Sequence, residues 1–414
     1  MHRRTLALLL FLASTSLACG TGYEAESGGV SPGLSSVTEP AGDAPPPSSI
    51  VTAPLPPAGG FGPLVVAPQR ERAKPSAPSS SSGPGGEGAD CWASPVLTEY
   101  RLPQAGGKPS WVAAAPDGSV WFSDPATTSV ARLEPSGAIT RYSFPDERTP
   151  GSLAVGRDGS VWVATAGPAI AHLTRSGRLV GYAVPTTRGN PMGGVGDTVP
   201  TALTVGPDGA IWFVEMGADK VGRVGADGTV TEYPLPERDR IHANPEGLAV
   251  GSDGALWFSE TLKMRMGRID PKTFAISEFP IPPVPAGVPP ATVTAGPDGA
   301  LWFDGPMGSA LGRMTTTGEF KAYPLPWQGQ YSPNSITAGP DRRLWVIDSR
   351  NGKVLRMTVD GEVSELPAVS DPRGLHSAGL EQMEAGRDAV WFAQPAVNRI
   401  GRYACAGPDP SDAV

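Results

Sequence analysis

The sequence predicts an all-β protein: a seven-bladed β-propeller closed by its own N-terminal strand. Two observations predict it. A stretch running in its clearest copy from Pro245 to Glu260 recurs along the chain, and its tryptophan returns at intervals of 41 to 50 residues. That interval is typical of one four-stranded blade. Aligning the copies on this tryptophan gives seven of them, centred on Trp121, Trp162, Trp212, Trp257, Trp302, Trp345 and Trp391.

Composition agrees with this fold and excludes some partners. The 414 residues include 53 Gly and 47 Pro, which disfavour long helices and favour short strands joined by turns. A net charge of −8 argues against nucleic acid, whose phosphates need a basic surface. After the N-terminus no apolar run is long enough to span a bilayer.

Each copy is interpreted as four strands. The first is small and apolar, as in residues 248–250, and an Asp-Gly turn follows it. The second carries the Trp, with side chains alternating toward the two neighbouring blades. The third resembles Val-Gly-Arg-Val, as in residues 221–224, and the fourth resembles Thr-Glu-Tyr-Pro, as in residues 231–234.

The fourth-strand pattern shows how the ring closes. It follows the first six tryptophans, but the seventh copy ends with a third strand at residues 399–404. The missing pattern lies at residues 96–103, before the first copy. We therefore expect the N-terminal strand to complete the last blade. Cys91 and Cys405 flank the two strands that should pair, so we expect a disulfide between them in an exported protein, the alternative being two free thiols.

The N-terminus indicates export. Residues 1–18 have a basic start and a short apolar core, as in a signal peptide. Leu17-Ala18-Cys19-Gly20 resembles a bacterial lipobox, which predicts lipidation of Cys19; ordinary cleavage near Ala18 is the alternative. The expected location is the bacterial cell envelope, as an outer-membrane lipoprotein or a secreted protein. Membrane contact is expected only through the lipid anchor, and a monomer is expected.

Residues 19–90 are rich in Pro, Gly, Ser and Ala and predict a disordered tether, since they can bury little apolar surface. Residues 64–66 form a lone apolar patch within it. The propeller is expected to span residues 91–405, followed by a disordered tail at 406–414.

Two repeat positions are expected to meet near the central channel, on one face of the ring. The lead-in position lies eleven residues before each Trp (ten in the last copy), and the exit position lies three after it. The lead-in residues are Ser110, Gly151, Thr201, Glu246, Ala291, Asn334 and Glu381, and the exit residues are Asp124, Thr165, Glu215, Glu260, Gly305, Asp348 and Gln394.

Carboxylates at these positions are candidates for a site, because other copies manage with Gly, Ala or Thr. Glu215, Glu246 and Glu260 lie in adjacent blades and offer the oxygen ligands that Mg²⁺ or Ca²⁺ prefers. Asp348 and Glu381 are expected across the channel. The alternative is that these side chains bond neighbouring loops or face water.

Long loops on the same face supply further candidates. His242 and His376 are the histidines placed to act as acid or base; the alternative is a surface role, which is the commoner one for a loop histidine in a propeller. Trp327 and Tyr331 are expected to form a stacking platform for a ligand ring. His172 falls in a third strand, where a structural role is expected.

The phrases Gly-Pro-Asp-Gly-Ala-Leu-Trp-Phe, Val-Gly-Arg-Val and Thr-Glu-Tyr-Pro-Leu-Pro resemble the virginiamycin B lyase (streptogramin lyase) family over all seven copies. The resemblance implies a seven-bladed propeller that opens type B streptogramins by Mg²⁺-dependent elimination. It also implies Pro-His-Gly at the lead-in position of two late blades, with a Glu two residues before one His and a Glu at that blade's exit position.

This chain matches the implied site in part. Glu215 and Glu260 match the exit Glu, but Pro-His-Gly is absent, and Glu246, Asn334 and Glu381 stand at lead-in positions. We expect a propeller that binds a small molecule or envelope ligand through Glu246, Glu381, Asn334, Trp327 and Tyr331, without streptogramin lyase activity. One alternative is a divalent-cation-dependent, carbon–oxygen lyase-like enzyme or hydrolase for a cyclic ester or lactone, using His242, His376 and Glu260. A purely structural envelope protein is the other.

Overall fold

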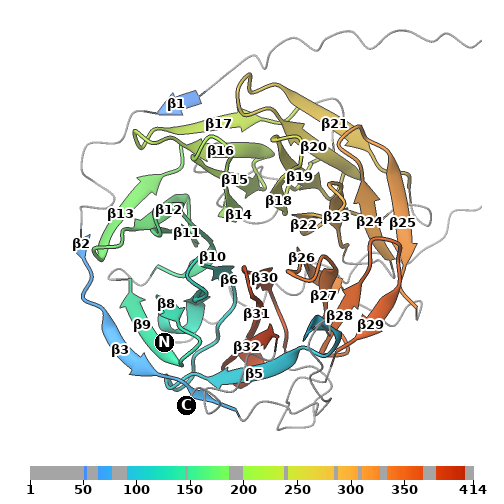
Figure 1. Cartoon of the computed structure of the whole chain (residues 1–414). Coiled ribbons are helices and arrows are strands. Elements are labelled where there is room, and N and C mark those ends of the chain that lie inside the picture. The colour runs from blue at the N-terminus through green and yellow to red at the C-terminus, as the bar shows by residue number, and fades with distance from the viewer. Residues whose placement is uncertain are drawn as a thin grey trace, which may run out of the picture. The chain divides into compact units, whose positions relative to one another are not determined.

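The computed structural model describes residues 51–53, 64–76, 91–144, 148–185, 199–236, 241–283, 288–305, 310–326, 333–366 and 379–405. The chain divides into residues 1–46 and 47–414, and all described residues belong to the second unit. They form seven antiparallel sheets around a central axis, which confirms the predicted seven-bladed propeller (Figure 1). The described part of the chain contains no helix long and apolar enough to cross a membrane.

Within each blade the first strand of the repeat lies innermost, and the second, third and fourth strands follow outward in order (Figure 1). The first three blades, from the inside out, are β6 (Val112–Ala114), β7 (Val120–Asp124), β8 (Ser129–Leu133), β9 (Ala138–Ser143) and β3 (Gln69–Arg72); β10 (Pro150–Val155), β11 (Val161–Thr165), β12 (Ala169–Leu173), β13 (Arg178–Ala183) and β2 (Leu64–Val65); and β14 (Val199–Val205), β15 (Ile211–Met216), β16 (Lys220–Val224), β17 (Val230–Pro234) and β1 (Val51–Ala53).

Blades four to six have four strands and blade seven has five. They are β18 (Leu248–Val250), β19 (Leu256–Glu260), β20 (Arg265–Ile269) and β21 (Ile276–Pro280); β22 (Val293–Ala295), β23 (Leu301–Phe303), β24 (Ala310–Met314) and β25 (Phe320–Pro324); β26 (Pro333–Ala338), β27 (Leu344–Asp348), β28 (Lys353–Met357) and β29 (Val363–Glu365); and β30 (Met383–Ala385), β31 (Ala389–Gln394), β32 (Arg399–Ala404), β5 (Val96–Arg101) and β4 (Lys74–Pro75). Three 3₁₀ turns accompany them: η1 (Cys91–Ala93), η2 (Pro125–Thr127) and η3 (Pro395–Val397).

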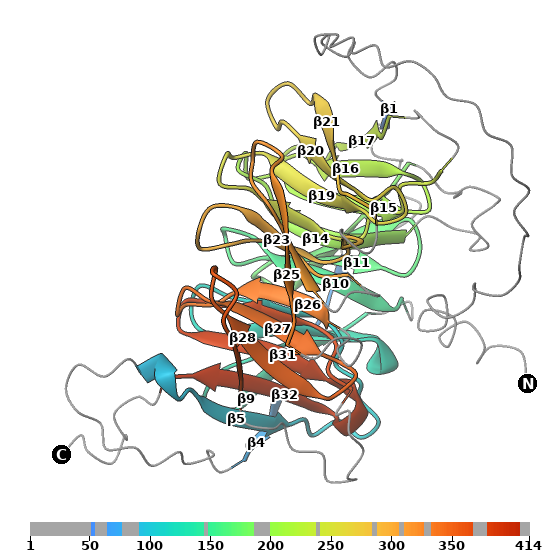
Figure 2. The ribbon, with the colours of Figure 1, turned by 90° about the vertical axis from the view of Figure 1, so that its right-hand side faces the viewer.

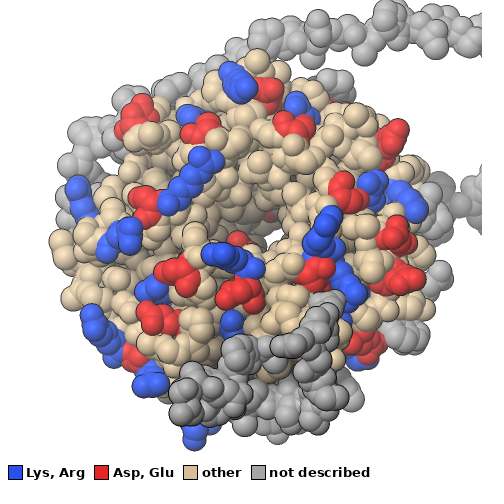
Figure 3. All heavy atoms as spheres, viewed as in Figure 1, with Lys and Arg blue, Asp and Glu red and all other residues tan. Residues whose placement is uncertain are grey.

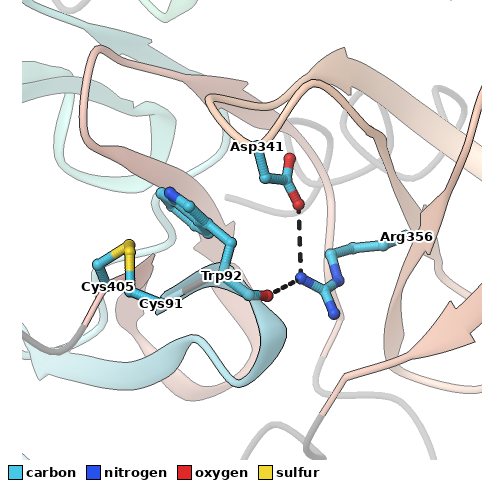
Figure 4. The surroundings of a disulfide bond; sticks show 5 residues. All are labelled: Cys91, Trp92, Asp341, Arg356 and Cys405. Atoms are coloured by element: carbon cyan, nitrogen blue, oxygen red, sulfur yellow. Dashed lines mark hydrogen bonds and ion pairs between the residues drawn. A yellow bond between two sulfur atoms is a disulfide. The ribbon is translucent and has the colours of Figure 1, made fainter. Parts of the chain in front are cut away.

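The ring closes as predicted. The N-terminal strand β5 pairs antiparallel with the C-terminal strand β32 from Val96 opposite Ala404 to Arg101 opposite Arg399. Cys91 and Cys405 form a disulfide with Cα atoms 5.1 Å apart (Figure 4). Two termini of the propeller are therefore joined both by a strand pair and by a covalent bond.

The disulfide turn also docks on the preceding blade. Trp92, next to Cys91, packs edge-on against Trp345 of blade six, with ring centroids 5.8 Å apart. Arg356 donates a hydrogen bond to the Trp92 carbonyl and forms an ion pair with Asp341 at 3.4 Å (Figure 4). The closure region is thus fixed to blade six as well as blade seven.

A three-residue unit explains the repeated Asp, Trp and Arg. In blade five the buried Trp302 donates its indole N–H to Asp298 of the turn at 2.9 Å. Arg313 of the third strand donates to the other carboxylate oxygen of Asp298 at 2.7 Å. Because the carboxylate accepts from both the buried indole and the partly exposed guanidinium, the turn, second strand and third strand are fixed together. The same unit recurs as Asp208–Trp212–Arg223, Asp253–Trp257–Arg268 and Asp341–Trp345–Arg356.

Blade two replaces the arginine with His172, which stacks on Trp162 at a centroid distance of 3.9 Å. Burial lowers the pKa of His172, which favours the neutral ring. His172 therefore has the structural role that the sequence predicted.

The cores lie between blades, and the third-strand glycine allows the sheets' aromatic residues to pack there. In blade three Phe213 lies over Gly222, where an added Cβ would be 2.0 Å from the ring. Phe213 and Ile211 pack against Ala164 and Ile170 of blade two. The opposite face of the same strand, with Trp212, packs against blade four.

Residues 64–76, called the strap here, differ from the expected tether. Their strands β2, β3 and β4 add a fifth, outermost strand to blades two, one and seven, and β1 does so on blade three (Figures 1 and 2). Composition predicted no core for this segment, and it builds none of its own, although Ala73 enters the core between blades seven and one. It pairs its backbone with outer sheet edges that later parts of the chain provide.

Candidate functional site

The space-filling view shows an opening at the centre of the ring (Figure 3). Several lead-in residues bond across the junctions between neighbouring blades. Ser110 of blade one donates to the Glu381 carboxylate of blade seven at 2.5 Å. Asn334 of blade six donates to the Glu381 carbonyl at 3.2 Å. Burial raises the pKa of Glu381. Glu381 and Asn334 therefore take part in bonds between neighbouring loops, which is the alternative that the sequence left open.

The exit residues do not line the channel, contrary to expectation. Their side chains are at most 1% exposed in all six blades that carry one: Asp124, Thr165, Glu215, Glu260, Asp348 and Gln394. The reason is the strand alternation. Glu215 shares a face with Ile211 and Phe213, and that face packs against blade two. Residues at this position are enclosed between blades.

Glu215 and Glu260 are buried carboxyl groups in which neither oxygen has a hydrogen-bond partner. Burial, reinforced by the neighbouring Glu232, raises the pKa of Glu215 to about 8. Burial, reinforced by Glu278, raises the pKa of Glu260 to about 7. Both groups are therefore held largely as neutral acids near pH 7 or just below it.

Asp219, in the turn before the third strand of blade three, organises the loop that leads into blade four. Its carboxylate bonds Nδ1 of His242 at 2.7 Å. It also accepts the backbone N–H groups of Ala243 at 3.0 Å and Asn244 at 3.1 Å. The His242 side chain is 40% exposed, so an imidazole oriented by a carboxylate stands at the surface of this junction.

Glu246 completes the cluster from the lead-in position of blade four. It is half-buried and accepts a hydrogen bond from the Asn244 amide at 2.7 Å. Burial, reinforced by Asp304 of blade five, raises its pKa to about 7. Asp304 is fully buried, bonds the N–H and hydroxyl of Thr292, and has its pKa raised by burial to about 6. Two carboxyl groups at this junction thus have pKa values raised toward neutral pH.

Sequence reasoning missed Asp219 and Asp304. A signal existed for Asp219: it occupies a left-handed turn position with φ 52°, where other blades have Thr128, Met264, Gly352 and Asn398. Asp304 follows Trp302 by two residues, where blade four has Ser259, whose hydroxyl accepts the Gly247 N–H. In both cases a carboxylate replaces a smaller or neutral residue at one repeat position.

The described residues do not fit the Mg²⁺ or Ca²⁺ site expected at Glu215, Glu246 and Glu260. Among residues whose side chains the structure describes, no group of three His, Cys, Asp or Glu is arranged to hold a metal ion. The unpartnered oxygens of Glu215 and Glu260 are enclosed between blades, on different sheets. His376, Trp327, Tyr331 and Cys19 lie outside the described residues.

The structure is a β-propeller of seven radial sheets whose N-terminal strand closes the ring. The face of the ring that carries the lead-in residues is called the lead-in face. The candidate site is the polar cluster on this face, at the junction of blades three to five. The sequence model of the virginiamycin B lyase family matches residues 93–243 and 194–408. The chain belongs to the virginiamycin B lyase family.

Individual relatives agree. A virginiamycin B lyase from Nocardia farcinica (strain IFM 10152) is 38% identical over 137 residues, which are 33% of this chain and 45% of the relative. The match thus spans less than half the relative's length. A catalytically inactive histidine-to-alanine variant of virginiamycin B lyase from Staphylococcus aureus, crystallised with quinupristin, is 31% identical, with TM-score 0.66 over 75% of this chain and 99% of the other. A streptogramin B lyase structure gives the same identity and TM-score over 77% and 100%.

Proposed function

We propose that this propeller binds a small molecule or envelope ligand on its lead-in face, around Asp219, His242, Asn244 and Glu246, and that it is not a streptogramin lyase. The carrying observation is that Asn334 and Glu381 hold the lead-in positions of blades six and seven, the late blades, where the family resemblance implies the histidine of Pro-His-Gly. Lead-in positions of the whole ring hold no histidine. A base that removes a proton from substrate is therefore missing from the position the family uses.

The chemistry of the cluster favours a ligand with a cationic or hydrogen-bond-donating group. Glu246 has a pKa of about 7, so near neutral pH about half of it carries a proton. A bound ammonium or similar group would stabilise the carboxylate form and displace that proton. Ligand binding would then release protons, which distinguishes recognition by Glu246 from recognition by a group that stays charged.

Quinupristin serves as the test ligand, because a relative has been crystallised with it. The purified chain is incubated with quinupristin and Mg²⁺, and ring opening is followed by mass spectrometry. We expect no linear product, and we expect calorimetric binding whose heat depends on the buffer's ionisation enthalpy at pH 7. Glu246→Gln should abolish the buffer dependence, whereas the exposed Glu319→Gln should not. Linear product from the wild-type chain would refute the proposal.

One observation favours a second function, catalysis on another cyclic ester or lactone. His242 is held by Asp219 at 2.7 Å, the arrangement by which a carboxylate orients an imidazole for acid–base work. On this alternative a divalent cation would be required, and the half-buried Glu246, rather than the enclosed Glu260, would be the carboxylate that reaches the substrate. Turnover of a panel of depsipeptides and lactones, lost in Glu246→Ala and His242→Ala, would favour it. Calorimetric titration showing no Mg²⁺ or Ca²⁺ binding at millimolar concentration would remove it.

Export and lipid anchoring are part of the proposal. Residues 1–18 and Cys19 carry the signal, and they lie outside the described residues. We expect the mature chain to begin at a diacylated Cys19 in the cell envelope. Intact-mass measurement after expression in a bacterium tests this, with Cys19→Ser as control. A mature chain without lipid, identical in mass shift to that variant, would favour ordinary secretion.

A further inference from the structure

The polar side chains between blades follow a common order in four sheets. Counting outward from the channel, a basic residue on the third strand pairs with a glutamate on the fourth. In blade three Lys220 lies 2.6 Å from Glu232, and in blade four Arg265 lies 3.2 Å from Glu278. Blades six and seven repeat the order with Lys353–Glu365 and Arg399–Glu99.

In blade one this order of basic and acidic side chains is shifted outward by one strand. Its third strand carries Ser129, its fourth carries the base, Arg141, and the acid comes from the fifth strand, as Glu71 of the strap at 3.5 Å. Arg141 is only 1% exposed. It also bonds Ser129 at 2.7 Å and lies 3.6 Å from Asp124. Asp124 belongs to blade one itself, whereas the acid on the outer side of the buried Arg141 guanidinium comes from the strap. Blade one alone would leave that outer side of the guanidinium without an acid.

The strap meets this edge in a defined register. Gln69 to Arg72 pair antiparallel with Arg141 to Ala138, and the Ala73 N–H then bonds the Gly137 carbonyl at 2.8 Å. Ala73 is buried in the core shared by blades seven and one. Gly137 has φ 84°, and a Cβ at this position would lie 2.9 Å from the Ala73 carbonyl oxygen. Position 137 must therefore be glycine for the strap to pack against this turn.

We propose that the outer edge of blade one is a peptide-binding site for an extended strand whose carboxylate reaches Arg141, and that the chain's own segment Gln69–Arg72 occupies it. This is recognition by strand addition: main-chain hydrogen bonds supply affinity, and one side-chain contact supplies selectivity. The preferred ligand is an extended peptide with a glutamate followed, two residues later, by a small residue at the position of Ala73.

The occupant is held at this edge by a small number of contacts. It contributes four paired residues, one ion pair and one buried alanine, and the exposed side chains of Gln69, Arg70 and Arg72 face solvent. Its advantage over a free peptide is its covalent link, which gives an effective concentration on the order of millimolar. Weakening the ion pair in the chain should therefore open the site to a competing strand.

The test uses the full chain and a fluorescent synthetic peptide with the sequence of residues 64–76. Binding is measured by anisotropy on the wild type, on Glu71→Gln, and on Arg70→Gln as the matched control from the exposed side of the same strand. We expect Glu71→Gln to bind the peptide about tenfold more tightly than the other two chains, because a charge-assisted contact of the occupant is lost. A peptide in which this glutamate is glutamine should bind Glu71→Gln about tenfold more weakly.

Hydrogen exchange provides a second readout that needs no peptide. The amides of Ala73 and Ser76, which bond Gly137 and Glu99, should exchange several-fold faster in Glu71→Gln than in wild type or Arg70→Gln. If Glu71→Gln matches Arg70→Gln in both exchange and peptide affinity, or if the glutamine peptide binds as well as the glutamate peptide, the site does not recognise the carboxylate and the proposal fails.

Discussion

Asp219 and His242 join two blades: the carboxylate of one lies 2.7 Å from Nδ1 of the other, across the junction of blades three and four. The same carboxylate accepts two backbone N–H groups of the loop that leads to Glu246. The relationship gives the lead-in loop of blade four a fixed shape. Blade seven uses Asn398 in the equivalent turn, where it donates to the Gln104 carbonyl at 2.7 Å. Asp219 differs from Asn398 in bringing a carboxylate, and with it an oriented imidazole.

Asp219→Ala should destabilise the fold and loosen this loop. Removing the carboxylate leaves the N–H of the buried Ala243 without its acceptor, which costs about 1–3 kcal/mol. Asp219→Asn keeps one oxygen for the two backbone donors and should lose less than half as much. Urea unfolding, monitored by tryptophan fluorescence, measures both. Equal losses for the two variants would mean that the backbone bonds to Asp219 do not hold the loop.

Glu215 should make stability fall as the pH rises. Its folded-state pKa of about 8 lies above the ordinary value of 4.5, so folding binds its proton more tightly. The resulting stabilisation is complete below about pH 4.5 and is lost as the pH rises through about 8. Glu215→Gln should be more stable than wild type by roughly 1–3 kcal/mol at pH 9 and similar at pH 5. Thermal unfolding at both pH values tests this, with Glu319→Gln as an exposed control; a constant difference across pH would contradict it.

Much of the scaffold could be predicted because it is written in repeated residues. The spacing of the tryptophans gives the blade number, and the displaced fourth-strand pattern gives the closure and the cysteine pair. The orientation of the exit residues could also have been derived. If Trp212 faces one neighbouring blade, Glu215, three residues later, faces the other, and both faces are covered.

The strap could not be predicted in this way. Its residues show no long periodic pattern, and their pairing depends on edges formed by later residues, such as Ala138 to Arg141. Asp219 and Asp304 depend on contacts with the next blade, which spacing within one copy does not reveal. Local pattern therefore defines each blade, whereas the candidate site arises at the junctions between blades.

Asp298→Ala should test the unit that each repeat uses to fix its turn. The substitution leaves the buried Trp302 indole N–H and the Arg313 guanidinium without their shared acceptor, at a cost of about 2–3 kcal/mol. Asp298→Asn retains an acceptor for the indole but loses the ion pair, so it should fall between alanine and wild type. Urea midpoints rank the three proteins. An alanine variant as stable as wild type would show that packing alone holds the blade.

The Cys91–Cys405 disulfide should stabilise the closed ring in a way that reduction can reverse. It links residues 314 positions apart, and in the chain-entropy model a loop of that size contributes about 6 kcal/mol by restricting the unfolded chain. A reducing agent should lower the unfolding midpoint of the wild type, and the Cys91→Ser/Cys405→Ser variant should unfold at that lowered midpoint with or without it. The strand pair β5–β32 and the Trp92–Trp345 contact remain in that variant, so the reduced ring should still fold. Loss of folding on reduction would mean that the covalent bond, rather than the shared blade, closes the propeller.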